Sequence, residues 1–387
     1  MKRLQLKYNL VQILYWISAC ALQGYVAIYL QYKGLTNIQI GIVTSISSIL
    51  TIFISPYISS LLHKIKKLTI NILLYWLFLI SLLIFLAITY LPLSGYIIMF
   101  AYIIIYCLSI SIIPLLSSLA MNYLQAGQEI NFGLARGMGS VSYALSAILI
   151  SQSINLFSPN VLAIIYLIAS ICLIMIIHQL PDNKIIINEK EEHKSLLFMI
   201  KKYKSLFYLL LGFAFCFAGA IALATYLINI IKNLGGNTNT YGIAIFIMSI
   251  SELPVMALTK RLINNVNIMK LFIFAGICYL LRNSLIALAP HILIVYTGML
   301  FQSMSYGMLT SLLTYYVANI CKPEEEIMGQ TLISIMTCGV GATIGNLFGG
   351  ILQDTFGIEA MLLFVVISTM IGTTIMVFVS YKNIVKI

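Results

Sequence analysis

The sequence predicts an all-α polytopic membrane protein with twelve transmembrane helices, arranged as two six-helix pseudo-repeats around a central cavity. Apolar residues make up 61% of the 387 residues and charged residues 9%, which leaves too little polar surface for a soluble protein of this length. Apolar segments of about 20 residues, each able to cross about 30 Å of hydrocarbon as a helix, recur along the chain. They are predicted at 9–30, 38–62, 70–91, 96–121, 130–154, 161–180, 205–231, 240–259, 268–289, 291–319, 328–352 and 359–381.

Lysine and arginine are distributed unequally between alternate loops. With the N-terminus in the cytoplasm, the inner segments hold all of the 22 Lys and Arg residues except Lys33 and Lys232 in outer loops and Arg136 and Arg282 within spans. Because cytoplasmic loops are enriched in these residues, both termini are expected to be cytoplasmic, in a bacterial-type plasma membrane. The net charge of +11 then follows from topology and an anionic inner leaflet. Nucleic-acid binding is not needed to explain it.

A repeat relates the two halves of the chain, on either side of one long polar segment. The predicted domains are a six-helix bundle at 1–180, a cytoplasmic central loop at 181–204 and a second six-helix bundle at 205–387. Landmarks recur at nearly one offset: Tyr29 with Tyr226 (226 − 29 = 197), Pro56 with Pro254 (254 − 56 = 198) and Gly133 with Gly329 (329 − 133 = 196). Parallel repeats of this kind occur in transporters with a substrate site between them. Chance spacing among common residues is the alternative.

Arg136 lies inside the predicted span 130–154. An arginine cannot lose its proton, and placing one in hydrocarbon costs roughly 2.5 to 3.5 kcal/mol on insertion scales, so such residues usually face a watery cavity or a partner. Tyr143 follows seven residues later, about two helical turns, and therefore shares its face. The alternative is that Arg136, near the cytoplasmic end, extends to lipid headgroups. A cavity-facing arginine indicates transport.

Two motifs resemble those of the major facilitator superfamily, and the resemblance extends over essentially the whole chain. The loop after the second span, 56–67, is similar to a degraded form of the family signature, with Ser59 and His63 in place of its Gly and Asp. The segment Phe132-Gly133-Leu134-Ala135-Arg136-Gly137-Met138-Gly139-Ser140-Val141-Ser142-Tyr143 is more specific. It resembles the fifth helix of the branch that contains the galactoside–proton and nucleoside–proton symporters.

The resemblance implies roles for several residues. Arg136 is expected to bind substrate hydroxyls through its planar guanidinium, and Tyr143 to stack on the substrate ring. By family analogy, substrate contacts are also expected for Gln23 in the first helix and for Gln302 and Tyr306 in the tenth. Gating is expected of three residues near the ends of spans: His63, Lys64 and Asp354.

Glu252 and Arg282 are the charged residues deep in spans of the second half. Proton coupling needs a group that titrates between two environments, and a carboxylate tuned by a nearby arginine supplies one. The resemblance places Arg282 at the ninth-helix arginine of the galactoside permeases' proton site, whereas their tenth-helix His and Glu become Gln302 and Ser305. Glu252 is therefore the expected proton carrier. The alternative is a structural pairing of Glu252 with Arg282 or a helix end.

These features favour a secondary active transporter that uses alternating access for proton symport of a polar small molecule, such as a sugar or nucleoside. Proton-driven efflux of amphipathic compounds, or transport of another small solute, is the alternative. An enzyme is disfavoured because the spans carry no deep catalytic or metal constellation, and the seven cysteines lack metal-ligand spacing. A non-transporting sensor is also disfavoured, because we would expect it to carry an attached signalling domain or a long tail. We expect no cofactor beyond a proton gradient, no metal, and a monomer whose partners are substrate, protons and lipid.

Overall fold

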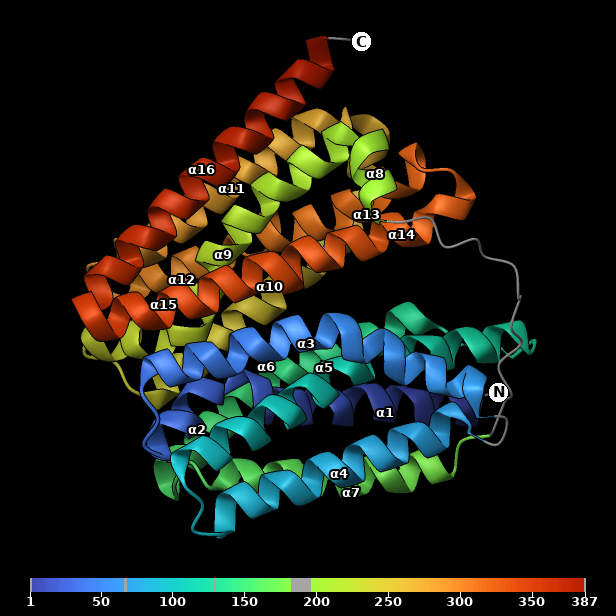
Figure 1. Cartoon of the computed structure of the whole chain (residues 1–387), viewed down its shortest axis with the longest axis vertical. Coiled ribbons are helices and arrows are strands. Elements are labelled where there is room, and N and C mark those ends of the chain that lie inside the picture. The colour runs from blue at the N-terminus through green and yellow to red at the C-terminus, as the bar shows by residue number, and fades with distance from the viewer. Residues whose placement is uncertain (1, 66–67, 129, 182–195, 386–387) are drawn as a thin grey trace. The chain divides into compact units, whose positions relative to one another are not determined.

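The computed structural model describes residues 2–65, 68–128, 130–181 and 196–385, and every regular element among them is helical (Figure 1). These residues form two compact units, Met1–Asn188 with Thr238–Phe246, and Glu189–Asn237 with Ile247–Ile387. Most of the predicted central loop, 182–195, lies outside the described residues, so the predicted domain limits stay predictions. The last part of that loop forms a short helix, α8 (Leu196–Lys202).

The first unit begins with a bent helix that packs against two later ones. α1 contacts α6 and α7, while α4 and α7 lie side by side (Figure 1). The core contains Tyr15, Leu77, Phe78, Leu115 and Leu173. The elements are α1 (Lys2–Ala19), the π-helix η1 (Cys20–Gly24), α2 (Val26–Tyr32), α3 (Asn37–Lys64), α4 (Ile70–Tyr90), α5 (Gly95–Gln125), α6 (Phe132–Leu156) and α7 (Val161–His178).

The second unit is organised around α9, which packs against α11, α15 and α16. Phe213 and Tyr279 are fully buried in its core. After α8, the elements are α9 (Lys204–Asn233), α10 (Thr238–Asn265), α11 (Ile268–Ala287), α12 (Ile292–Leu300), the π-helix η2 (Ser303–Gly307), α13 (Met308–Ile320), α14 (Pro323–Ser334), the π-helix η3 (Ile335–Gly341), α15 (Ala342–Phe356) and α16 (Ile358–Val385). The start of α10 is grouped with the first unit.

Among the described residues, ten helices are long and apolar enough to cross a membrane, or up to eleven if the bent pair formed by Arg3–Gly24 and Val26–Tyr32 is one span. The predicted segment 240–259 is helical too, within α10, where several side chains are not described. The spans predicted at 291–319 and 328–352 each contain a π-helix. The predicted class, an all-α multi-pass membrane protein, is confirmed.

The backbone repeats at the first long helix of each half, but at a different offset from the one predicted for the tyrosines. Tyr25 interrupts its helix at φ −110°, ψ 19°, and Tyr226 interrupts α9 at φ −104°, ψ 16°. Nine residues after each tyrosine, Gly34 and Gly235 adopt φ of +84° and +78°, a conformation that glycine adopts without steric cost. The structure therefore relates Tyr226 to Tyr25 rather than to Tyr29, at an offset of 226 − 25 = 201.

A fully buried carboxylate in the second unit joins α14 to α8 and to the residue that precedes α9. Glu325, near the start of α14, accepts hydrogen bonds from Lys202 Nζ at 2.8 and 2.6 Å and from the Tyr203 hydroxyl at 2.6 Å. A buried carboxylate is tolerated when it is paired and hydrogen-bonded. The hydrogen bond from Lys202 to Glu325 raises the pKa of this lysine, so the lysine's contribution to stability is present at neutral pH and is lost as the pH rises through that raised value. The contact fixes α8 and the start of α9 to α14.

Removing one partner of this contact should cost more than removing both charges. Lys202→Met leaves the Glu325 carboxylate buried without its cation, whereas the double variant Lys202→Met/Glu325→Met replaces the pair with apolar side chains. We expect the apparent melting temperature of the detergent-solubilised protein to fall clearly in the single variant and to recover at least partly in the double variant. Equal melting temperatures for the two variants would contradict a role of Lys202 in stabilising the buried charge.

Candidate functional site

The predicted substrate residue Arg136 lies in α6 of the first unit, stacked on an aromatic side chain of α1. The guanidinium carbon lies 4.1 Å from the centre of the Trp16 ring, and Nη1 donates a hydrogen bond of 2.8 Å to Ser140 Oγ one turn further along α6. Arg136 is half-buried. Such stacking on an indole stabilises a guanidinium and fixes its plane.

Trp16 was not predicted from the sequence as a site residue, yet a chain of hydrogen bonds holds it in place. Its Nε1 donates to Gln12 Oε1 at 3.2 Å, Gln12 Nε2 donates to the Tyr8 hydroxyl at 2.8 Å, and that hydroxyl donates to the Leu116 carbonyl of α5 at 2.9 Å. Tyr8 and Gln12 are buried. The spacing 8, 12, 16 places these residues on one helix face, which is the signal that could have indicated Trp16.

Tyr143 extends the same aromatic surface. Its ring meets Trp16 edge to face, with centroids 6.0 Å apart, as the shared face of α6 predicts. Gly139 makes this approach possible, since a Cβ there would lie 2.3 Å from the Trp16 ring. The structure thus brings Arg136, Trp16 and Tyr143 together. Gln23 is the third predicted substrate residue of this unit, and its Nε2 donates to Ser109 Oγ of α5 at 2.9 Å.

In the second unit, the predicted proton carrier lies against a predicted substrate residue. Gln302 Nε2 donates a 2.7 Å hydrogen bond to Glu252 Oε1. Arg282 is buried at 1% exposure and donates from Nη1 to Asn283 Oδ1 at 2.8 Å. Glu252 interacts with Arg282 electrostatically, although the described residues include no direct ion pair of Arg282. Glu252, Gln302 and Arg282 therefore form one polar cluster.

Two predicted site residues lie in π-helical segments, which are frequent at functional sites. Gln23 belongs to η1 and Tyr306 to η2. The Tyr306 ring stacks on Phe217 at 5.6 Å. Next to it, a Cβ at Gly307 would lie 3.7 Å from Glu252 Cγ, so η2 also borders this polar cluster. Hydropathy and residue spacing carry no signal for these π-helices.

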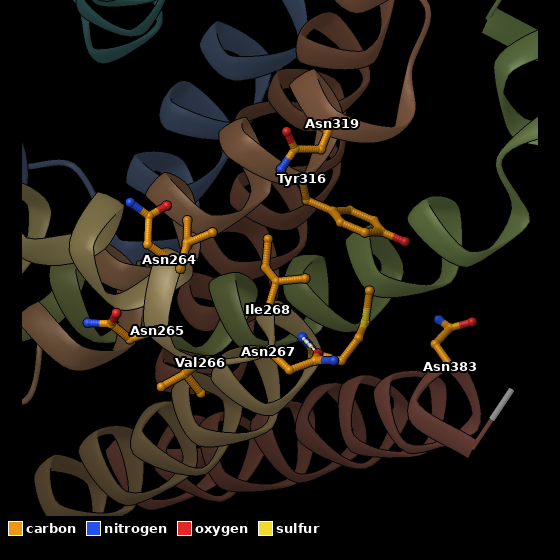
Figure 2. Close-up of a pocket in the computed structure, with 10 residues that line it drawn as sticks. Asn264, Asn265, Val266, Asn267, Ile268, Tyr316, Asn319 and Asn383 are labelled. Carbon is orange, nitrogen blue, oxygen red and sulfur yellow. Dashed lines mark hydrogen bonds between the residues drawn. The ribbon is translucent and has the colours of Figure 1, made fainter. Parts of the chain in front are cut away.

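The last predicted site residues are the three gating residues. The side chains of His63 and Lys64 lie outside the described residues, and Asp354 is exposed near the end of α15, so their gating roles stay predictions. Within the described part of the chain, no group of three or more His, Cys, Asp or Glu side chains could hold a metal ion. A separate cavity of about 630 Å³, half of whose lining residues are asparagines, lies in the second unit (Figure 2).

The contact between Gly139 and Trp16 can be tested by fluorescence. The chain has two tryptophans, so Trp76→Phe leaves Trp16 as the only indole. In that background, Gly139→Ala should shift the emission maximum, because the new methyl group would displace the ring. Gly137→Ala is the matched control, since no atom lies within 4 Å of a Cβ there. Identical spectra for the two glycine variants would contradict the packing of Trp16 on α6.

Comparisons with known proteins agree with this architecture. The family model described as "MFS_1 like family" matches residues 5–381. A relative from Bacillus subtilis, named the uncharacterized transporter YwbF, is 25% identical over 275 residues, covering 70% of this chain and 68% of the relative. The maltose permease of Geobacillus stearothermophilus is 24% identical over 274 residues, covering 70% and 69%.

Solved structures show the same fold. The crystal structure of a variant of the nucleoside transporter NupG matches with a TM-score of 0.81 at 15% identity, covering 97% of this chain and 98% of that chain. A bacterial homolog of the lysosomal transporter Spinster matches with a TM-score of 0.70 at 10% identity, covering 98% and 97%. These relatives are transporters rather than enzymes. The chain belongs to the MFS_1 like family, and it is a multi-pass membrane transporter of the major facilitator superfamily.

Proposed function

We propose that this chain transports a polar, hydroxyl-bearing small molecule, such as a sugar or a nucleoside, by proton-coupled symport with alternating access. The observation that carries the substrate class is the stack of Arg136 on Trp16 beside Tyr143. A guanidinium presents several N–H donors in one plane, which suits paired hydroxyl oxygens. The neighbouring aromatic faces suit the flat side of a sugar ring or a base.

The relatives give independent support for this substrate class. The names of the similar proteins include a maltose permease and a nucleoside transporter, and both sugars and nucleosides carry neighbouring hydroxyl groups. For the same protein we propose a monomer in a bacterial plasma membrane with both termini in the cytoplasm, based on the concentration of Lys and Arg in alternate loops.

The cluster around Glu252 supports proton coupling. Gln302 Nε2 donates to Glu252 Oε1, while Gln302 Oε1 is buried and has no hydrogen-bond partner among the described residues. A side-chain amide can donate to a carboxylate and can accept from a carboxylic acid. Gln302 can therefore satisfy both protonation states of Glu252, and the positive charge of Arg282 favours release of the proton.

Transport by the purified protein in liposomes tests the substrate site. Under an imposed inward proton gradient, we expect accumulation of at least one labelled sugar or nucleoside, and collapse of that accumulation by a protonophore. Arg136→Ala should lower substrate affinity by about tenfold or more, because it removes the guanidinium donors proposed to bind the substrate hydroxyls. Arg136→Lys should recover little, because an ammonium lacks the planar donors. Lys232→Ala, which removes an exposed cation elsewhere, is the control.

Normal binding of a transported sugar or nucleoside by Arg136→Ala would remove this residue from the substrate site. Absence of uptake across the panel, combined with proton-driven export of amphipathic dyes from everted vesicles, would contradict the symport proposal and favour efflux instead.

The proton carrier is tested separately. Glu252→Gln should retain exchange of internal for external substrate and lose uphill accumulation, since an amide cannot take up and release the proton. Glu359→Gln, at an exposed acidic residue of α16, is the matched control. Undiminished gradient-driven accumulation in Glu252→Gln would contradict the coupling role while leaving the substrate site unaffected.

A further inference from the structure

A groove in the second unit combines basic and apolar side chains that transport by the proposed mechanism does not use. A cavity of about 710 Å³ lies between the start of α9 and the end of α16, which pack against each other. One side consists of Lys204, Ser205, Tyr208 and Leu211 of α9. The residues contributed by α16 are Thr374, Ile375, Phe378, Val379, Lys382 and Asn383.

The groove is polar at one end and apolar at the other. Ser205 of α9 donates a hydrogen bond of 3.3 Å to Asn383 of α16, which places the first turn of α9 beside the last turn of α16. Lys204 and Lys382, the neighbours of these two residues in the chain, are therefore at the same end. Leu211 and Ile375 lie about two turns away from it along their helices. This order matches a phosphate headgroup followed by an acyl chain.

The basic end has unused capacity to bind an anion. Lys204 and Lys382 are both exposed, and within the described part of the chain neither makes a hydrogen bond or an ion pair with an acidic side chain. Asn383 Oδ1 accepts the hydrogen bond from Ser205, whereas Asn383 Nδ2 is buried without a hydrogen-bond partner among the described residues. Two ammonium groups and an amide donor are thus available where α9 and α16 leave the membrane.

A second cavity adjoins this end through the same asparagine. Asn383 also lines the cavity of about 630 Å³, together with Asn264, Asn267, Asn319 and Tyr316 (Figure 2). These side chains are polar and uncharged at neutral pH, so they can exchange hydrogen bonds with hydroxyl groups. Space for a hydroxyl-bearing headgroup therefore lies next to the two lysines.

We propose that the groove between α9 and α16 binds one anionic glycerophospholipid. Its phosphate lies between Lys204 and Lys382, its headgroup hydroxyls reach the asparagines beside Asn383, and an acyl chain follows Tyr208, Leu211 and Phe378. Tyr208 and Phe378 are 49% and 66% exposed, which leaves this face open to lipid in a membrane-embedded helix pair. Basic pockets between transmembrane helices bind anionic headgroups in this way. The proposal requires membrane insertion and is independent of the substrate and of proton coupling.

Native mass spectrometry of the detergent-purified protein tests the site. Phosphatidylglycerol, which is anionic and carries headgroup hydroxyls, is titrated against phosphatidylethanolamine, which is zwitterionic. We expect Lys204→Gln/Lys382→Gln to weaken phosphatidylglycerol binding by at least about tenfold, since each basic residue near an anionic headgroup contributes measurably, and to leave phosphatidylethanolamine binding unchanged. The control Lys270→Gln/Lys322→Gln removes two exposed cations that do not line the groove.

A second variant separates lipid from a soluble anion. Thr374→Trp places a large ring in the apolar part of the groove and keeps both lysines, so phosphatidylglycerol binding should fall although the charge is unchanged. Glycerol phosphate, which lacks acyl chains, should not compete at equal concentration. Equal losses in the two lysine pairs, undiminished binding in Thr374→Trp, or effective competition by glycerol phosphate would each overturn the proposal.

Discussion

The cost of placing a polar or charged group in a low-dielectric interior governs this structure. Hydrocarbon offers no hydrogen bonds, so each backbone amide and each ionic side chain in a span needs a partner within the protein or a watery space. The helices satisfy the backbone. Each embedded charge has its own contact: Arg136 is stacked on Trp16, Arg282 donates to Asn283, and Glu252 accepts from Gln302. These polar contacts distinguish the structure from a bundle held together by apolar side chains alone.

The π-helical segments follow from the same constraint. A π-helix leaves some carbonyls without their usual partners and widens the turn, which is tolerated where the chain gains something from the altered geometry. In the first unit, η1 precedes the helix break at Tyr25 and contains Gln23. In the second unit, η2 contains Tyr306 and borders Glu252. Thus η2 borders the polar cluster of Glu252, Gln302 and Arg282, whereas η1 holds Gln23 where it bonds to Ser109 of α5.

The positions of the helices could be predicted from the sequence, whereas most side-chain contacts could not. Hydropathy sums over about 20 residues, so it locates a span even when single residues are ambiguous. A contact such as that of Trp16 with Arg136 depends on the rotation of α1 against α6, which is set by packing at Gly139.

Glu325 is a residue whose burial the local sequence does not indicate. It lies in a run of three glutamates that suggests an exposed loop, yet it is fully buried because Lys202 and Tyr203 reach it from α8 and α9.

Gln302 illustrates why a predicted residue and its role have to be considered separately. The family resemblance relates it to a histidine of the galactoside permeases and suggests a substrate contact, and that role stays a prediction. Its observed bond is to Glu252, the residue expected to carry the proton. Histidine and glutamine can both donate to a carboxylate and accept from a carboxylic acid, but only histidine titrates near neutral pH. Glutamine at this position therefore supplies a hydrogen bond to Glu252 without being a second titratable group beside it.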